Sequence, residues 1–266
     1  MSRQERHDRH VEEIERQVRQ LRVVVTSGAD LAARVPTCPD WSLEELVRHT
    51  GGALRWVDHM VRLRAPREVP EPEVPGYGGP VERGDAAALD AWLAEAGQLV
   101  VGALREAGPD TPVWTWAWER NTGFWARRVT HELTIHRADA TLAAGLPYEV
   151  APDVAADAID EWLQIVEYVQ RTQPDDAARE LRGPGRTLHL HATDAPAGLD
   201  AEWVVELTEE GVVWRRGHEK ADVALRGPLT EVLLAFYRRV TPDSGRLEVL
   251  GERELLEFWL ERATFG

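Results

Sequence analysis

Apolar residues recur three and four positions apart over the first two thirds of the chain, which predicts a series of amphipathic helices. A first helix is expected over residues 8–34, because Pro36 and Pro39 would end it. Ser42 and Glu45 form a capping-box pattern, which starts a second helix at the next residue. The second to fifth helices are expected at 43–63, 86–106, 122–144 and 152–170.

The spacing of apolar residues changes from about 3.6 to 2 beyond about residue 180, which predicts strands. Strands are expected at 186–193, 202–208, 211–216, 221–226 and 246–250, and helices at 229–239 and 252–263. Strands grouped before helices fit an α+β domain with an antiparallel sheet. The chain is therefore predicted to hold an N-terminal all-α up-down four-helix bundle, residues 1–175, and a C-terminal α+β domain, residues 176–266. Residues 66–84, rich in Pro, Gly and Glu, are expected to form a long loop or lid within the bundle.

Composition narrows the classes of protein to which the chain can belong. Hydrophobic residues make up 43% and charged residues 29% of the 266, a balance typical of globular proteins, and the formal charge of −15 argues against a nucleic-acid partner. The absence of a run of about 18 apolar residues and the charged N-terminus predict a cytoplasmic protein without a membrane span. The single cysteine, Cys38, has no obvious neighbouring base, so we expect it to be a small buried apolar residue and not a nucleophile.

Three polar residues predict a metal site inside the bundle. Glu132 and His136 lie four apart, so both side chains leave one face of a helix about one turn apart. His49 continues the apolar stripe of the second helix and is expected to point inward as well. Two histidines and one glutamate match a catalytic zinc site with an open fourth position. The spacing alone leaves a second interpretation open, a hydrogen-bonded or salt-bridged pair in the core.

Other chemistry-bearing residues are assigned lesser roles. Asp139 is either the acceptor of the second ring N–H of His136 or a solvated helix residue. His131 is turned about 100° from Glu132 on a helix, which makes it a flanking residue. His189 and His191 share one face of a predicted strand, and without a third partner they are interpreted as structural.

Two motifs together resemble the mycothiol-dependent maleylpyruvate isomerase family, whose N-terminal part is a DinB-like metal-binding bundle. They are VPTCPDWSLEELVRHTGG and the E-x-x-x-H-R-x-D pattern from Glu132 to Asp139. The later segments LHLHATD and ADVALRGPLTEVLLAFYRR are similar to that family's C-terminal domain, which resembles sterol-carrier folds. The resemblance implies a zinc ion held by His49, Glu132 and His136, with the thiol of mycothiol in the open position.

A metal-bound thiol is deprotonated, so the implied activity is S-transfer to a small electrophile or its cis–trans isomerisation. Arg128, one turn before Glu132, is the candidate catalytic residue that would hold an anionic substrate, and Arg238 or Arg239 would be a second cation. The alternative is a non-catalytic, metal-stabilised ligand-binding or regulatory module whose metal has four protein ligands. The expected partners are a small thiol and a small electrophile, without nucleic acid or membrane, in a monomer or homodimer.

Overall fold

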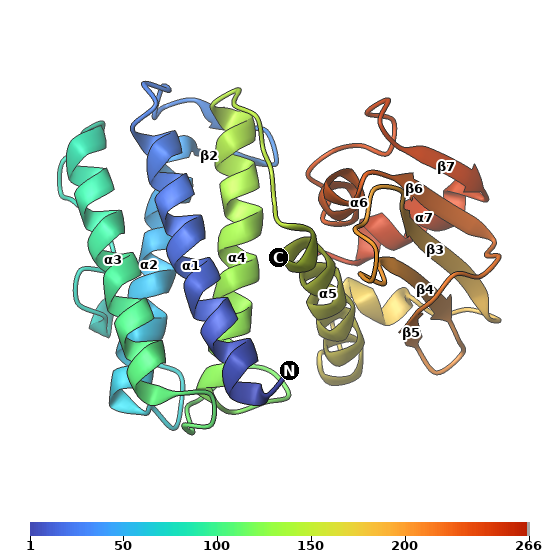
Figure 1. Ribbon diagram of the computed structural model, residues 1–266, viewed down its shortest axis with the longest axis horizontal. Helices are drawn as coiled ribbons and strands as arrows, with labels where there is room; N and C mark the ends of the chain where they lie inside the picture. Colours follow the sequence, from blue (N-terminus) through green and yellow to red (C-terminus); the bar gives the residue numbers. More distant parts are fainter. Residues whose placement is uncertain (265–266) are drawn as a thin grey trace. The chain divides into compact units, whose positions relative to one another are not determined.

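A computed structural model describes residues 1–264 and divides the chain into two compact units, Met1–Tyr148 and Glu149–Gly266 (Figure 1). The first unit holds four long helices, a two-stranded hairpin and a 3-10 turn. Their bounds are α1 Arg3–Val25, β1 Arg34–Val35, β2 Cys38–Ser42, α2 Leu43–Leu63, η1 Glu71–Glu73, α3 Ala86–Ala107 and α4 Thr122–Ala143. The predicted fold class, a helical N-terminal domain followed by an α+β domain, is confirmed.

The four helices pack around one apolar core. Both α1 and α2 pack against α3 and α4, so α1 and α2 occupy opposite corners of the bundle. One fully buried leucine from each helix illustrates this core: Leu21, Leu46, Leu93 and Leu133. Each buried leucine contributes about 1.5–3 kcal/mol to folding. Among the described residues, only α3 is long and apolar enough by composition to cross a membrane, and it packs against α1 and α2 in this core.

The first helix differs from its prediction at both ends. It begins at Arg3, because Ser2 and Glu5 form a capping box, and it ends at Val25 instead of residue 34. Gly28, with φ of +86°, turns the chain in the left-handed region that glycine tolerates. The residues that follow form the hairpin β1–β2, which the proline pattern did not reveal.

The loop predicted over residues 66–84 holds only the short η1 and is fixed to α2 by a buried arginine. Arg48 donates hydrogen bonds to the carbonyl oxygens of Pro80 and Glu82 at 2.7 and 2.9 Å. Its guanidinium also pairs with Glu44 one turn earlier, at 2.7 Å. The loop is therefore anchored where it crosses the N-terminal part of α2.

The second unit is a five-stranded sheet with helices. Its elements are α5 Pro152–Thr172, η2 Ala177–Glu180, β3 Arg186–Ala192, β4 Glu202–Leu207, β5 Val212–Arg216, β6 Val223–Gly227, α6 Leu229–Phe236, β7 Glu248–Gly251 and α7 Arg253–Arg262. The strand order is β5-β4-β3-β6-β7. The predicted antiparallel sheet is wrong in one pairing: β6 lies beside β3 and runs parallel to it, so the sheet is mixed. The physical reason is that the chain crosses from one edge, β5, to the far side of β3 before forming β6.

Helix α5 groups with the sheet, so the two units divide after Tyr148, whereas the sequence placed the boundary after residue 175. It packs against α6, η2 and β5. Asp160 of α5 accepts from the indole of Trp203 at 2.8 Å and pairs with Arg216 at 2.7 Å. These contacts with β4 and β5 are distant in sequence, which is why the helical periodicity of α5 did not indicate its domain.

Candidate metal centre

His49 is positioned by the well-defined start of α2. The backbone N–H of Glu45 donates to Ser42 Oγ at 3.3 Å, and the Glu45 carboxylate accepts from the Ser42 N–H at 2.8 Å, which confirms the predicted capping box. The start of the helix fixes the direction of each later side chain. His49 lies two turns along, half-buried beside Trp41, with 4.8 Å between ring centroids.

Glu132 and His136 are positioned by α4, whose N-terminus is capped by Asn121. The side chain of Asn121 accepts from the backbone N–H of Phe124 at 3.0 Å. As the four-residue spacing predicts, Glu132 and His136 leave the same face, with His136 Nε2 2.9 Å from Glu132 Oε1. The packing of α2 against α4 then brings His49 to this pair.

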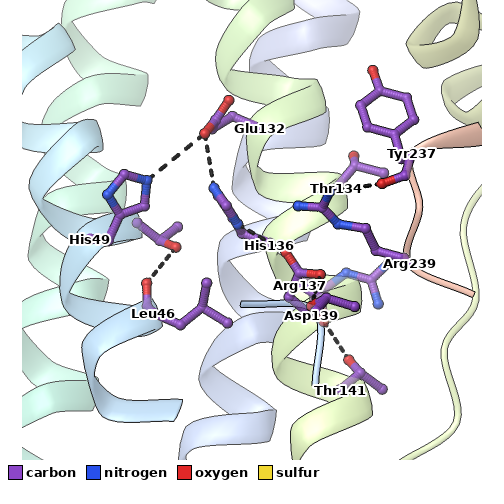
Figure 2. Close-up of polar contacts among 12 residues, drawn as sticks. Leu46, His49, Glu132, Thr134, His136, Arg137, Asp139, Thr141, Tyr237 and Arg239 are labelled. Atoms are coloured by element: carbon purple, nitrogen blue, oxygen red, sulfur yellow. Dashed lines mark hydrogen bonds and ion pairs between the residues drawn. The ribbon is translucent and has the colours of Figure 1, made fainter. Parts of the chain in front are cut away.

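The three residues form one cluster, called here the triad (Figure 2). One ligand atom from each lies within 4.8 Å of the other two, and His49 Nε2 is 4.0 Å from Glu132 Oε1. Atoms that share a tetrahedral zinc ion lie about 3.4 Å apart, so the distances of 2.9 and 4.0 Å fit such an ion after small side-chain shifts. Within residues 1–264, no fourth histidine, cysteine or carboxylate joins this cluster.

Two further side chains, Asp139 and Arg128, form hydrogen bonds to triad residues and orient them. Asp139 is completely buried, and its Oδ2 lies 3.1 Å from His136 Nδ1 while its Oδ1 accepts from Thr37 Oγ1 at 2.6 Å. This arrangement bears out the interpretation of Asp139 as the partner of His136 and excludes the solvated one. Arg128, only 8% exposed, donates from Nη2 to Glu132 Oε2 at 2.7 Å. Both imidazole and carboxylate are therefore oriented, as ligands in metal sites usually are.

The charges in the site shift the pKa of each triad residue. Burial opposes the charge on His136, but hydrogen bonds to Asp139 and Glu132 outweigh it and raise its pKa to about 9. Burial likewise opposes the charge on Glu132, but Arg128 and His136 hold its pKa well below the usual value. Burial, and then the neighbouring His136, lowers the pKa of His49. At neutral pH a metal would find an ionised Glu132 and a neutral His49, and would displace a proton from His136.

The remaining candidates take other places. His131 is buried and lies edge-on to His10 of α1, with 5.9 Å between ring centroids, so it is outside the triad. Cys38 on β2 is half-buried, more exposed than expected. Arg239 donates to the carbonyl oxygen of Tyr237 at 2.8 Å within its own unit. Substrate binding by Arg128, Arg238 or Arg239 stays a prediction.

The interpretation of His189 and His191 needs a correction, because they do have further partners. Glu202 Oε2 lies 2.9 Å from His189 Nε2 and 2.7 Å from His191 Nδ1, and His218 Nδ1 lies 2.7 Å from the same oxygen. Sequence reasoning missed this group because the three segments are joined only by strand pairing. The alternation of His189 and His191 was the one local signal.

Comparisons with known proteins agree with this architecture. Residues 11–141 match the family model described as the mycothiol maleylpyruvate isomerase N-terminal domain, and residues 153–258 match the C-terminal domain of the same family. A crystal structure of a histidine-to-alanine mutant of the mycothiol-dependent maleylpyruvate isomerase is similar in fold, with a TM-score of 0.55, 15% identity and 95% of each chain covered.

Two further solved structures do not share the fold of the chain by their scores. Two structures of a sec-alkylsulfatase, one described as from Pseudomonas sp., cover 100% of this chain and 33% of their own, at 14% and 16% identity and TM-scores of 0.30 and 0.31. Such scores are too low to indicate a shared fold. No curated protein matches the chain.

From its two domain matches, which together span most of its length, the chain belongs to the mycothiol maleylpyruvate isomerase family.

Proposed function

We propose that the protein is a zinc-dependent enzyme that activates a low-molecular-weight thiol, mycothiol, for S-transfer to a small electrophile or for its cis–trans isomerisation. The observation that carries this proposal is the triad, which offers two imidazoles and one carboxylate without a fourth protein ligand among the described residues. The side chains of His49 and Glu132 are 37% and 35% exposed, so a small molecule can reach them. Three protein ligands and an accessible position are typical of catalytic zinc.

The residues around the triad have separate tasks in this proposal. His49, Glu132 and His136 would hold the zinc, which supplies Lewis acidity that keeps a coordinated thiol ionised at neutral pH. Asp139 accepts from Nδ1 of His136 and so leaves Nε2 of the ring to face Glu132 and His49. This assignment fixes the tautomer that a ligand needs.

Arg128 is proposed as the positioning residue for Glu132 and as the buried cation of the site. Its pairing with Glu132 Oε2 leaves Oε1, the oxygen that faces both histidines, for the metal. The positive charge of its guanidinium would also attract an anionic group of a substrate. An acidic electrophile such as maleylpyruvate has the charge that this cation recognises.

The proposal is tested with tag-free protein whose metal is exchanged for cobalt. Adding mycothiol or another small thiol should change the visible spectrum, because a thiolate enters the coordination sphere. His49→Ala should lose this response, whereas His59→Ala, which removes a half-buried histidine of α2 outside the triad, should keep it. Thiol-dependent turnover is then measured on a panel of electrophiles that includes maleylpyruvate.

Each negative outcome has its own meaning. Purified protein without bound metal that also takes up none when supplied would overturn the metal site. A cobalt spectrum that thiols leave unchanged would favour the metal-stabilised binding module. A thiol response without turnover of any electrophile would retain thiol binding and contradict the proposed catalysis on the tested class.

A further inference from the structure

Four metal-ligating side chains gather on the sheet of the second unit, well separated in sequence from the triad. They are His189 and His191 of β3, Glu202 of β4 and His218 just after β5, and they are called here the strand cluster. One ligand atom of each lies within 4.8 Å of the others. The three imidazole rings stand edge-on to one another, with centroids 5.3–5.5 Å apart.

The sheet register builds the strand cluster. His189 and His191 are two residues apart on β3, so they share a face, and Glu202 lies directly opposite His191 on β4. β5 pairs with β4 from the other side, and its last pair joins Trp203 to Arg216. The chain then continues the ladder, since Gly217 N–H donates to the Glu202 carbonyl at 3.0 Å.

Gly217 directs His218 back to the cluster. Its φ of +155° is one that side-chain-bearing residues rarely adopt, so the turn that follows β5 depends on glycine at this position. The nearby carboxylate of Glu219 is held by Arg215, whose Nε donates to it at 3.0 Å. Glu202 is therefore the carboxylate that faces the three histidines.

Hydrogen bonding alone does not satisfy this group. Three imidazole nitrogens approach one oxygen, Glu202 Oε2, at 2.7–2.9 Å, although an oxygen of this kind accepts about two well-directed bonds. Nε2 of His189 is buried and has no hydrogen-bond partner among the described residues, despite lying 2.9 Å from that oxygen. Its side chain is only 7% exposed, so water does not compensate for the missing partner.

A divalent cation between the four atoms would satisfy all of them. Ligand atoms around tetrahedral zinc lie about 3.4 Å apart, so the three histidine–glutamate distances of 2.7–2.9 Å would each lengthen by about 0.5–0.7 Å. Imidazole nitrogens with one carboxylate oxygen favour zinc and neighbouring transition metals, because calcium and magnesium prefer oxygen ligands. The donor set therefore selects the class of metal.

We propose that the strand cluster is a second metal site, in which His189, His191, Glu202 and His218 bind one divalent transition metal. Four protein ligands complete a tetrahedron, so this site is closed, in contrast to the triad with three. The ion cross-links β3, β4 and the segment after β5. Its role is to stabilise this edge of the sheet, and it performs no chemistry on substrates.

The test is a zinc titration of the tag-free, full-length chain in competition with a chromogenic chelator. Wild type should bind two zinc ions per chain. His191→Ala/His218→Ala should bind one, and His49→Ala/His136→Ala should also bind one, now in the strand cluster. Glu202→Gln should weaken the second site by at least about tenfold. The matched control Glu206→Gln, on the same strand and face but outside the cluster, should bind zinc as wild type does.

The variants are chosen so that misfolding cannot imitate the expected result. His189 is buried, so the double variant replaces His191 and His218 instead, whose side chains are 23% and 71% exposed. Zinc should raise the melting temperature of wild type and of His49→Ala/His136→Ala by several degrees, and that of His191→Ala/His218→Ala by clearly less. In the cobalt-loaded His49→Ala/His136→Ala variant, added thiol should leave the spectrum unchanged.

Two results would overturn the second site. One is a single zinc equivalent in wild type that disappears with the triad variant. The other is a second equivalent that survives in both His191→Ala/His218→Ala and Glu202→Gln. Neither depends on thiol binding or turnover, so the strand cluster stands or fails independently of the proposed function.

Discussion

Replacing Asp139 with asparagine tests whether the hydrogen bond behind His136 sets the metal affinity of the triad. With aspartate, Oδ2 accepts from His136 Nδ1 at 3.1 Å, which leaves the lone pair on Nε2 for a metal. Thr37 donates to Oδ1 at 2.6 Å, so an asparagine that keeps this bond presents its NH₂ group to His136. The imidazole proton would then move to Nε2, and the nitrogen that faces Glu132 could no longer bind a metal.

The size of the effect follows from these two hydrogen bonds. Turning the amide over would restore the correct tautomer, because the Thr37 hydroxyl can also accept from the NH₂ group. A neutral amide oxygen would then replace the carboxylate as the acceptor of His136 Nδ1, which loses a charge-assisted hydrogen bond of about 1.5–3 kcal/mol. We therefore expect zinc affinity to fall about 10- to 100-fold, or roughly 1.4–2.7 kcal/mol. Loss of the carboxylate also lowers the pKa of His136 from about 9, which reduces proton competition, so the deficit should be larger at pH 9 than at pH 7.

The assay is chelator competition at both pH values, in the His191→Ala/His218→Ala background so that only the triad is measured. Thr37→Val is the matched control, because it removes the hydroxyl and keeps the Asp139 charge. Its zinc affinity should stay within about threefold of the parent. If Asp139→Asn also binds zinc within threefold at pH 9, the tautomer reasoning is refuted.

Three other predictions follow from single contacts. Ser42→Ala should lower the free energy of unfolding, measured in urea, by about 1 kcal/mol. Ser42→Asp should keep most of the wild-type stability, because aspartate also caps α2. An alanine variant as stable as wild type would contradict the capping role. The raised pKa of His136 stabilises the metal-free protein below about pH 6.5, and this stabilisation is lost as the pH rises towards 9. Zinc affinity should rise over the same pH window, because the metal displaces a proton from His136. Zinc affinity that is constant from pH 6.5 to 9 would contradict a protonated His136. Arg128→Met should destabilise the metal-free protein by roughly 2–3 kcal/mol, since Glu132 loses its charged partner. Zinc should raise the melting temperature more in this variant than in wild type. An equal rise would show that Arg128 does not compensate the Glu132 charge.

Signals that act over a few residues were readable in the sequence. The capping box at Ser42 gave the start of α2, and breakers between helices gave α3 and α4 to within one residue at each end. The four-residue spacing of Glu132 and His136 placed both on one helical face, as the structure has them. The change of period near residue 180 indicated strands because side-chain alternation is a local property of extended backbone.

The packing of distant segments was decided only in three dimensions. The end of α1, the hairpin after it and the membership of α5 depend on what each helix buries against, which periodicity does not specify. The alternation of apolar residues likewise does not specify which strands pair, so the parallel pairing of β3 with β6 could not be predicted from it.

The two polar clusters divide in the same way. The triad could be proposed from helix faces, and so could the place of Arg128 one turn before Glu132 on the same helix. The role of Thr37 follows from a contact with Asp139 that only the fold creates. The strand cluster was not foreseen, because Glu202 and His218 reach His189 through the register of three strands. Sequence by itself determined which helical faces carry ligands, since a helix fixes its own geometry; tertiary structure decided which residues meet across strands, since register is set by the whole sheet.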